Sequence, residues 1–311
     1  MKACAIDLGG THATCGLVED RILLAYETID TDRAKSLSAV LPQVVDVFDR
    51  LMNSKGLSLA ECSAVAVGFA GLVDSRAGRV LSTNGKYEDA TEIDLAEWSK
   101  ETLGLPLRIE NDARMALLGE SYAGAARGFT EVVMMTLGTG IGGVAMMDGK
   151  LLRGKHSQAG CLGGHIPILF NGRKCTCGAI GCAEAEAAGW SLPLVVKDWP
   201  GVSESALSKY SHVGFKELFE EAGRGDIVAV AIRDRCLNIW AADAVALTHA
   251  YDPEIIVMGG GVMQSADLII PYVESYLRQY SWTPWGDVQV RVAELGNNAA
   301  LLGAVPLLSE S

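Results

Sequence analysis

The chain has 311 residues, of which 49% are hydrophobic and 21% charged, so it can bury the core of a folded protein with one or two domains. Its formal net charge of −12 argues against the basic surface that nucleic-acid-binding proteins need. The sequence shows neither a signal peptide nor an uninterrupted apolar stretch of about 18 residues, so we expect a cytoplasmic protein without a membrane span, whose eight cysteines are free or metal-bound.

Strands and helices are expected to alternate along the sequence, which is typical of an α/β protein. Short apolar runs between tight turns predict strands, whereas apolar residues at helical spacing predict helices. The expected strands are residues 2–7, 12–18, 21–29, 63–70, 106–112 and 254–261, with a pair of strands within 134–146. The expected helices are residues 34–53, 95–103, 113–124, 226–251 and about 299–309.

Two segments of the chain look alike. Residues 5–18 (AIDLGGTHATCGLV) and 134–146 (MMTLGTGIGGVAM) each contain an apolar strand, a glycine-rich turn with a threonine, and a second apolar strand. This similarity indicates two halves of similar plan. We expect an N-terminal domain of residues 1–112 and a larger C-terminal domain of residues 113–311, with the final helix at about 299–309 packing back on the N-terminal domain.

Three expected strands end in glycine-rich turns, at residues 7–11 (DLGGT), 137–143 (LGTGIGG) and 258–261 (MGGG). Glycine allows the backbone to approach a ligand closely, so that consecutive N–H groups can converge on phosphate oxygens. Any one of these turns could simply close a hairpin. Three of them in one chain favour a nucleotide-binding protein.

Two familiar nucleotide motifs can be tested against these turns. The chain contains no G-x-x-x-x-G-K-[ST] motif, which excludes a P-loop NTPase. Gly138, Gly140 and Gly143 match the G-x-G-x-x-G pattern of dinucleotide-binding proteins, but that pattern requires a helix after the turn. A strand is expected there instead, so a nicotinamide-dependent oxidoreductase is only a distant alternative.

Two of the expected strands end in an aspartate. Asp7 ends the first strand, where it either caps the turn or accepts Mg²⁺ or its water shell near phosphates. Asp112 stands where a strand meets a helix, the position at which α/β sheets place ligands, although aspartate is also a good helix N-cap. As a catalytic group, Asp112 would take the proton of a hydroxyl that attacks a phosphoryl group, and Asn111 could bind the same ligand.

His165, Cys175, Cys177 and Cys182 have the number and type of ligands that fill a tetrahedral structural zinc site. Four protein ligands leave no position for a reactive water, so this metal would hold a loop rather than perform chemistry. The alternative is a disulfide with one unpaired cysteine. Such a metal site would also fix the position of Glu184, which becomes a candidate for binding a ligand hydroxyl rather than a solvated surface residue.

Six segments together resemble one known family. They are DLGGTHATCGLV, IENDARMALLGE, LGTGIGGVAMMDGKLLRGKHSQAG, GHIPI, CTCGAIGC-AE and PEIIVMGGGV. In this order, the chain resembles the sugar kinases of the repressor, open reading frame, kinase (ROK) family over nearly its whole length. The resemblance implies an actin-like ATPase (ribonuclease H-like) fold, with two α/β domains flanking an active-site cleft, and usually a homodimer. It also implies ATP, Mg²⁺ and structural Zn²⁺ as cofactors.

The resemblance further implies roles for individual residues. Asp112 matches the general base of the family. The residues implied to bind ATP and its phosphates are Asp7, Gly9, Gly10, Thr11, Gly138, Thr139, Gly140, Gly259 and Gly260. The residues implied to bind the sugar are Asn84, Asn111, Asp112, His165 and Glu184. The implied zinc ligands are His165, Cys175, Cys177 and Cys182.

One segment departs from the family pattern. The family usually has Ala-Gly-Glu-x-Gly-His at the start of the metal loop, which in this chain is the segment from His165 to Cys182. The glutamate of this pattern binds the sugar near the anomeric end. This chain has seven residues from Ala159 to His165, one more than the pattern, and the glutamate position holds Cys161 or Leu162. We therefore expect catalysis to be intact but the substrate to have a different or substituted anomeric end.

These observations predict an ATP-dependent kinase that phosphorylates a hydroxyl group, expected to be O6, of a hexose or hexose derivative. A sugar-sensing binding protein of the same fold is the main alternative, because a sugar-binding glutamate is missing. The family also includes repressors with an N-terminal winged helix, but the first strand of this chain is expected to begin at residue 2. The sequence does not identify the sugar.

Overall fold

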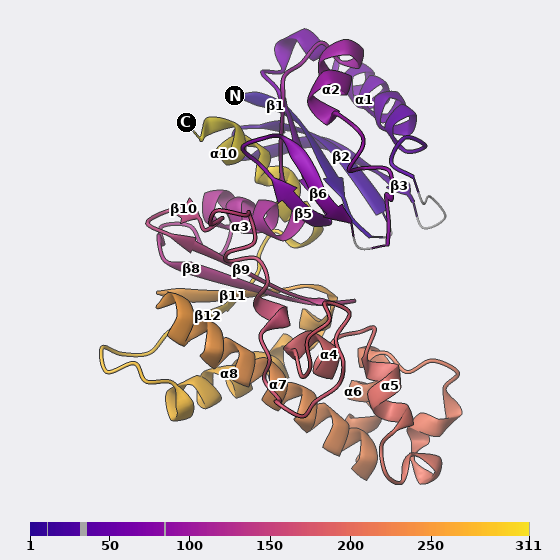
Figure 1. The fold of residues 1–311 in the computed structure, drawn as a ribbon, viewed down its shortest axis with the longest axis vertical. Helices are drawn as coiled ribbons and strands as arrows, with labels where there is room; N and C mark the ends of the chain where they lie inside the picture. Colours follow the sequence, from indigo (N-terminus) through magenta and orange to yellow (C-terminus); the bar gives the residue numbers. More distant parts are fainter. Residues whose placement is uncertain (11, 32–35, 84, 311) are drawn as a thin grey trace. The chain divides into compact units, whose positions relative to one another are not determined.

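The computed structural model of the chain describes residues 1–10, 12–31, 36–83 and 85–310 (Figure 1). The chain forms two compact units. Unit 1 consists of Met1–Gly128, Arg153–Ala159 and Glu294–Ser311, and unit 2 consists of Phe129–Leu152 and Gly160–Ala293. The chain thus enters unit 2 twice and ends in unit 1.

The sheet of unit 1 has five strands in the order β3–β2–β1–β4–β7. They are β1 (Lys2–Leu8), β2 (His12–Glu19), β3 (Ile22–Asp30), β4 (Val65–Phe69) and β7 (Leu107–Asn111). β2 is antiparallel to both of its neighbours, β1 and β3, whereas β1, β4 and β7 run parallel to one another. β4 is buried along its whole length, as a short apolar run in the middle of a sheet should be. The five strands expected from the sequence in this region are confirmed.

Helices cover both faces of this sheet. Cys15 and Leu17 of β2 pack in one hydrophobic cluster with α1, while Gly16 between them faces Leu301 of α9, because alternate residues of a strand point to opposite faces. The remaining elements of unit 1 are α1 (Leu41–Lys55), η1 (Leu59–Glu61), the hairpin of β5 (Gly71–Asp74) and β6 (Arg79–Thr83), α2 (Leu95–Thr102), α3 (Asp112–Ala123), η6 (Gly296–Asn298), α9 (Ala299–Leu302) and α10 (Ala304–Ser309).

The first helix is shorter than expected, because α1 begins at Leu41 and not at residue 34. The carboxylate of Asp89 accepts hydrogen bonds from the backbone N–H groups of Leu37 (2.5 Å) and Ser38 (3.1 Å), which holds this segment outside the helix. Pro42 lies in the first turn, where proline costs no helical hydrogen bond. Part of the expected helix, residues 34 and 35, lies outside the described residues.

Residues 113–128 belong to unit 1, whereas the division expected from the sequence placed them in the second domain. α3 continues directly from β7 and packs against α9, α10 and β4 of the same unit, which keeps this segment in unit 1. The expected final helix is divided into α9 and α10 at Gly303. A Cβ atom on Gly303 would lie 2.1 Å from the carbonyl oxygen of Met115, so glycine allows the close approach to α3.

The sheet of unit 2 has five strands in the order β10–β9–β8–β11–β12. They are β8 (Val132–Leu137), β9 (Ile141–Met147), β10 (Lys150–Leu151), β11 (Ile255–Gly259) and β12 (Gln289–Val292). β8 and β9 are antiparallel, while β8, β11 and β12 run parallel. The order β9–β8–β11–β12 repeats the order β2–β1–β4–β7 of unit 1, which confirms the prediction of two halves of similar plan.

Unit 2 is built around the helix α7 (Ile227–Tyr251), which begins at its N-cap Asp226 and is buried at Trp240. Its limits agree with the expected helix of residues 226–251. The other helical elements of unit 2 are η2 (Gly163–His165), α4 (Ala183–Ala187), α5 (Leu192–Lys197), η3 (Val202–Glu204), η4 (Ala206–Lys209), α6 (Phe215–Gly223), η5 (Gly261–Ser265) and α8 (Ala266–Tyr280).

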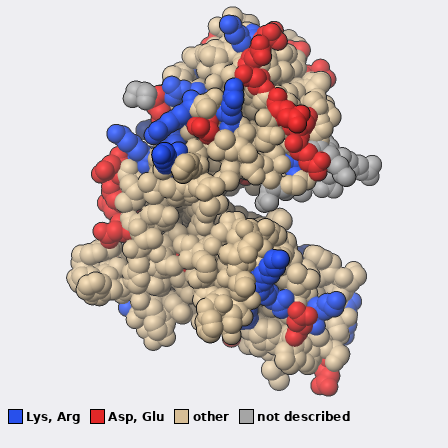
Figure 2. Space-filling view, viewed as in Figure 1, with Lys and Arg blue, Asp and Glu red and all other residues tan. Residues whose placement is uncertain are grey.

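Within the described part of the chain, no helix combines the length and the apolar character needed to cross a lipid bilayer. Figure 2 shows one face of the molecule, on which basic and acidic side chains are interspersed. This face therefore carries no continuous basic surface of the kind that binds the phosphates of nucleic acid.

Candidate active site

Two carboxylates and a glycine turn lie at one edge of the sheet in unit 1. In the parallel register, Asp7 of β1 pairs with Gly68 of β4, and the next residue of β4, Phe69, pairs with Asn111 of β7. The carboxyl ends of these strands therefore meet at the edge where α/β sheets place ligands. A Cβ atom on Gly68 would lie 3.4 Å from Oδ1 of Asp7, so a larger residue would crowd this carboxylate.

Asn111 is the N-cap of α3. Its Oδ1 accepts a hydrogen bond from the backbone N–H of Arg114 (3.2 Å), as an N-cap side chain does. Its Nδ2 donates to Oδ1 of Asp112 (2.9 Å) and to the carbonyl oxygen of Gly71 (3.1 Å). The backbone N–H of Ala113 also donates to Oδ1 of Asp112 (2.8 Å). The capping role considered for Asp112 thus belongs to its neighbour, which also orients the Asp112 carboxylate.

Burial raises the pKa of both carboxylates at this edge. The pKa of Asp112 rises to about 6 because of burial, against the opposing effect of its hydrogen bonds from Ala113 and Asn111. The pKa of Asp7 rises to about 7 because of burial and, second, the negative charge of Asp112. Oδ1 of Asp7 is buried and has no hydrogen-bond partner among the described residues. A buried carboxylate oxygen without a donor, close to a second carboxylate, fits a divalent cation or its water shell.

The turn between β1 and β2 leaves room for a ligand at its backbone. Gly9 donates its N–H to the carbonyl oxygen of His12 (3.0 Å), and the hydroxyl of Tyr87 donates to the carbonyl oxygen of Gly9 (3.2 Å). A Cβ atom on Gly10 would meet no described atom within 4 Å, so the space beside it is open. Thr11 and Asn84 lie outside the described residues. The resemblance implies phosphate binding for Thr11 and sugar binding for Asn84.

Unit 2 places the other two glycine turns side by side. β8 and β11 are parallel neighbours, and Thr136 pairs with Gly259 near the end of both strands. Gly260 has a φ of +92°, and a Cβ atom on it would lie 2.3 Å from the carbonyl oxygen of Leu137. This position accepts glycine only, because both the dihedral angle and the contact exclude a side chain. The turn at residues 138–140 and the turn after β11 therefore share one edge of the sheet.

The turn at residues 138–140 is followed by a strand and not by a helix. The N–H of Gly138 donates to the carbonyl oxygen of Gly140 (3.0 Å), and β9 begins at Ile141. The helix that a dinucleotide-binding motif needs is thus missing after this turn. The exposed Thr139 is held at its backbone, where its carbonyl oxygen accepts the N–H of Trp190 (3.0 Å).

Glu184 lies against the same turn and is only partly exposed. Its Oε2 accepts the backbone N–H of Ile141 (3.1 Å), and its Oε1 accepts the indole N–H of Trp190 (3.3 Å). A Cβ atom on Gly140 would lie 2.7 Å from Oε2 of Glu184. The structure thus brings Glu184 together with residues expected to bind phosphate. Sequence analysis missed Trp190, because it belongs to no motif and its role depends on this tertiary contact.

The four expected zinc ligands converge in unit 2. The side-chain ligand atoms of His165, Cys175, Cys177 and Cys182 all lie within 4.8 Å of one another. Sγ of Cys177 lies 3.7 Å from Sγ of Cys182, and Sγ of Cys175 lies 3.5 Å from Nδ1 of His165. Tetrahedral zinc with its usual bond lengths separates two sulfurs by ~3.8 Å and a sulfur and a nitrogen by ~3.6 Å. The donor set therefore fits zinc, and these three cysteines are free thiols.

Two glycines give the metal loop a tight turn. Gly178 and Gly181 have φ angles of +96° and +74°, and a Cβ atom on Gly181 would collide with the carbonyl oxygen of Leu169. Cys182 is the N-cap of α4, and Glu184 is the second residue of this helix. A metal ion bound to Cys182 would therefore also hold the carboxylate that contacts the glycine turn.

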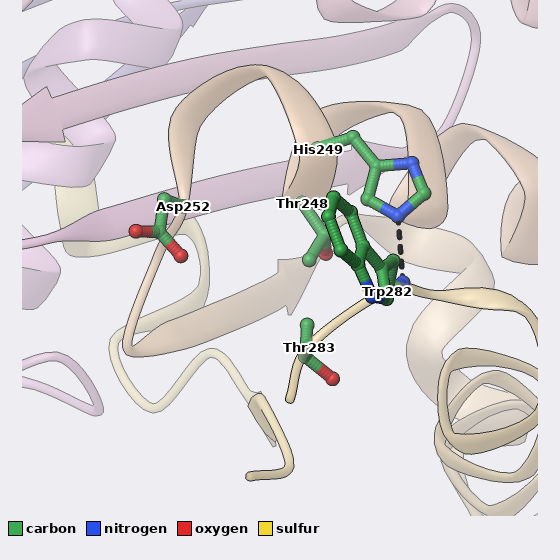
Figure 3. Close-up of a pocket in the computed structure, with 5 residues that line it drawn as sticks. All are labelled: Thr248, His249, Asp252, Trp282 and Thr283. Atoms are coloured by element: carbon green, nitrogen blue, oxygen red, sulfur yellow. Dashed lines mark hydrogen bonds between the residues drawn. The ribbon is translucent and has the colours of Figure 1, made fainter. Parts of the chain in front are cut away.

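A cavity of about 370 Å³ lies elsewhere in unit 2, at the end of α7 (Figure 3). Its lining residues are Thr248, His249, Asp252, Trp282 and Thr283. Nε2 of His249 accepts the backbone N–H of Trp282 (2.9 Å), whose side chain is 84% exposed. The cavity lies near the first residue of β11, whereas the glycine turn follows the last one. It is therefore separate from the turns, and no candidate site residue lines it.

The strand order of the two sheets and their glycine turns are typical of one class of proteins. Two sheets of the same strand order, each with a glycine-rich hairpin next to parallel strands, form the actin-like ATPase fold that the sequence led us to expect. The solved structure of a ROK hexokinase from Thermus thermophilus shares this fold, with a TM-score of 0.81 and 29% identity over 99% of this chain and 97% of that one.

Further comparisons place the chain within this class. A ROK family glucokinase from Streptomyces griseus, solved in complex with glucose and AMPPNP, is similar with a TM-score of 0.78 and 29% identity over 99% of both chains. A glucokinase from Thermotoga maritima is 30% identical over all of this chain and 98% of its own length. A family model described as "ROK family" matches residues 3–311. The chain belongs to the ROK family, as its motifs led us to expect.

Proposed function

We propose that this protein is an ATP-dependent hexose kinase that transfers the γ-phosphoryl group of ATP to O6 of a hexose or hexose derivative. The Asn111–Asp112 pair beside Asp7 carries this proposal, because it combines an oriented base with a candidate magnesium site at one sheet edge. The glucokinases and the hexokinase to which the chain is similar support the same reaction.

Asp112 is proposed as the general base. Its carboxylate accepts the proton of the sugar hydroxyl while that oxygen forms a bond to the γ-phosphorus of ATP, and the bond between this phosphorus and the β,γ-bridging oxygen breaks to release ADP. Its raised pKa makes Asp112 a stronger base than an exposed aspartate. Asn111 supports this role because it fixes one oxygen of the carboxylate by a hydrogen bond of 2.9 Å.

The glycine turns and Asp7 are proposed to hold ATP and its Mg²⁺. The buried Oδ1 of Asp7 suits the water shell of Mg²⁺, and the cation neutralises charge on the transferred phosphoryl group. The residues proposed to bind phosphates are Gly9, Gly10, Thr11, Gly138, Thr139 and Gly140. Gly259 and Gly260 are proposed to lie against the adenosine, and the open backbone at Gly10 supports a phosphate there.

The metal loop is proposed to bind Zn²⁺ as a structural ion and to shape the sugar site. His165, Cys175, Cys177 and Cys182 would be its ligands, and distances of 3.5 and 3.7 Å between pairs of donor atoms support tetrahedral coordination. When bound, zinc supplies rigidity and no open coordination position. The residues proposed to contact the sugar are Asn84, Asn111, Asp112, His165 and Glu184.

The substrate is proposed to carry a different or substituted anomeric end. Between Ala159 and His165, the chain has no carboxylate that could bind the hydroxyl groups at C1 and C2 of a free pyranose. Cys161 is half-buried and Leu162 is 39% exposed, so neither replaces a charged acceptor. Turnover of plain glucose at a rate equal to the best alternative sugar would contradict this part of the proposal.

We further propose that the enzyme is a cytoplasmic homodimer. The resemblance to the family supports the dimer, and free thiols together with the need for ATP support the compartment. Light scattering after size-exclusion chromatography tests the dimer directly, and a mass of one chain would contradict it.

The decisive test is ADP release from MgATP with a panel of hexoses, ketohexoses, N-acetylhexosamines and glycosides. Asp112→Asn should bind the sugar but lose turnover by about 10²–10⁴-fold, the usual contribution of a general base. Asp94→Asn is the matched control, because Asp94 caps α2 and has no proposed role. Retained activity in Asp112→Asn would refute the base. Sugar binding by calorimetry, with no turnover across the panel, would favour a sugar-sensing protein instead.

A further inference from the structure

Residues Arg153–Ala159, which we call the strap, leave unit 2 and belong to unit 1. Unit 2 holds both ends of this excursion at one residue of β9. The N–H of Leu152 donates to the carbonyl oxygen of Ala145 (3.0 Å), and the N–H of Ala145 donates to the carbonyl oxygen of Gly160 (2.9 Å). The strap is therefore a short loop with fixed ends, and what fixes its middle is found in unit 1.

A buried arginine of unit 1 holds the strap. Nη1 of Arg114 donates to the carbonyl oxygen of Ser157 (3.1 Å), and Nη2 donates to that of Ala159 (2.5 Å). Nη1 also pairs with Oε1 of Glu110 (3.2 Å), and both side chains are fully buried. Nε of Arg153, the first residue of the strap, pairs with the other oxygen of Glu110 (2.6 Å). The buried carboxylate of Glu110 thus forms ion pairs with two guanidinium groups.

The residues that hold the strap also surround the proposed base. Oε1 of Glu110 accepts the backbone N–H of Asn111 (2.9 Å), and Oδ1 of Asn111 accepts the backbone N–H of Arg114 (3.2 Å). Asp112 lies between these anchors in the chain. Arg114, which binds the strap, thus lies in the same turn of α3 as the proposed base.

The strap leads directly into the segment that departs from the family pattern. Ala159, whose carbonyl oxygen Arg114 binds, is followed by Gly160, Cys161 and Leu162. Gly160 has a φ of +63°, and a Cβ atom on it would lie 3.0 Å from the carbonyl oxygen of Leu152. Gly160 is thus held close to Leu152, one residue after the carbonyl oxygen that Arg114 binds.

Buried charges are costly, and a hydrophobic cluster of equal volume is often as stable as a buried ion pair. Arginine has five donors in a planar arrangement, so it can bind a carboxylate and two carbonyl oxygens together. Lysine has a flexible ammonium group and cannot reproduce this geometry. The arrangement thus favours a role in position over a role in stability alone.

We propose that Arg114 is a positioning residue for sugar recognition, which clamps the strap carbonyls of Ser157 and Ala159 so that residues 160–162 meet the sugar in a fixed conformation. The inference rests on the proposed kinase function.

The test compares steady-state kinetics of three variants, with the sugar that the wild-type protein turns over fastest in the panel above. Arg114→Lys should raise KM for the sugar at least tenfold and change KM for ATP less than threefold. Arg108→Met is the matched control, because Arg108 lies on β7 and donates to carbonyl oxygens of Leu307 and Glu310, not to the strap. Arg153→Lys, in which the partly exposed anchor is changed, should shift the sugar KM in the same direction.

A sugar KM within twofold of the wild-type value in Arg114→Lys would overturn the inference, as would an equal rise in the KM for ATP or the same rise in Arg108→Met. If Arg114→Lys does not fold, Arg153→Lys decides by the same criteria. If the wild-type protein has no kinase activity, the proposed function fails separately. Calorimetric affinity for the sugar of the panel that the wild-type protein binds most tightly then replaces the sugar KM, and an unchanged affinity in the variant overturns the positioning role.

Discussion

Asp7 and Asp112 are carboxylates whose position makes their charged form unfavourable. Burial is the largest cause of the raised pKa of each, and the charge of Asp112 adds to the effect at Asp7. A general base with a pKa near the working pH accepts a proton more strongly, and a cation placed between two carboxylates restores their charged forms. The same burial that disfavours the two charges would therefore prepare the site for the MgATP that we propose it binds.

The pH dependence of catalysis follows from these values. Asp112 must be deprotonated to act as a base, and its pKa is raised to about 6, so kcat/KM should be constant above about pH 7 and fall below about pH 6. Protonation of Asp7, with a pKa of about 7 in the protein without MgATP, should weaken binding of MgATP and so steepen the decline. Initial rates between pH 5 and 9 at subsaturating MgATP measure the profile, because bound Mg²⁺ would lower both pKa values. Circular dichroism at each pH shows whether the protein remains folded.

A profile that stays flat down to pH 5 in a folded protein would contradict Asp112 as the base. An exposed aspartate with an unshifted pKa of about 3.9 would give such a profile. The direction of the pKa shift is therefore testable, because burial raises the pKa of Asp112 and moves the fall in kcat/KM toward neutral pH.

At the scale of single elements, the glycine turns are determined by backbone contacts. Gly260 has a positive φ and lies against the carbonyl oxygen of Leu137, whereas a Cβ atom on the next residue, Gly261, would meet no described atom within 4 Å. Neighbouring glycines of one motif thus differ in their physical requirement. Sequence inspection alone treats them as equivalent.

Gly260→Ala should destabilise unit 2 and weaken binding of MgATP. The added Cβ atom would lie 2.3 Å from a carbonyl oxygen, so β8 and β11 must shift, and strain of this kind costs about 1–3 kcal/mol. Urea unfolding and calorimetric binding of AMPPNP measure the two effects. Gly261→Ala is the matched control and should change both quantities little. Equal stability and affinity in the two variants would show that the contact is unimportant.

The metal loop is the second element with a separable role. Cys177→Ser removes one of the four proposed ligands and should lower zinc content and weaken sugar binding more than ATP binding, because α4, with the proposed sugar ligand Glu184, follows Cys182. Elemental analysis measures the metal, and calorimetry measures each affinity. Cys62→Ser changes a cysteine outside the cluster and should retain zinc. Unchanged sugar affinity in verified zinc-free protein would contradict this role of the loop.

At the scale of the whole molecule, the C-terminal residues pack within unit 1, together with the N-terminal part of the chain. The buried carboxylate of Glu120 in α3 accepts backbone N–H groups of Ala125 (2.8 Å), Glu294 (3.2 Å) and Leu295 (2.8 Å). A Cβ atom on Gly119 would lie 1.9 Å from the carbonyl oxygen of Ala299, so α3 and α9 pack in close contact. Unit 1 therefore depends on residues at both ends of the sequence.

Deletion of residues 294–311 should unfold unit 1 and leave unit 2 folded. The deletion removes α9 and α10 from the face of the sheet opposite α1 and leaves Glu120 buried without two of its donors. Hydrogen exchange should show lost protection in β1, β4 and β7 but retained protection in β8 and β11, with zinc still bound. The full-length chain under the same conditions is the control. Retained protection in unit 1 would show that the terminal helices are dispensable.

The sequence by itself determined the strands that flank the glycine turns, the turns themselves, the spacing of His165 and the three cysteines, and the similarity of the two halves. Each of these depends on residues close together in the chain, where periodicity and turn chemistry act. The later start of α1 escaped prediction, because Asp89 binds the segment before it from about 50 residues away. The strands β5, β6, β10 and β12 escaped prediction as well, since each has at most five residues and shows too little alternation to be recognised.

Only the tertiary structure decided which side chains work together. It assigned the cap to Asn111 rather than Asp112, placed Glu184 against the turn at residues 138–140, and joined Arg114 to the strap. These contacts unite residues that are distant in the chain, and a buried polar group takes whichever partner the packed fold brings to it. Local pattern therefore predicted the kinds of residues in the site, whereas long-range packing selected their partners.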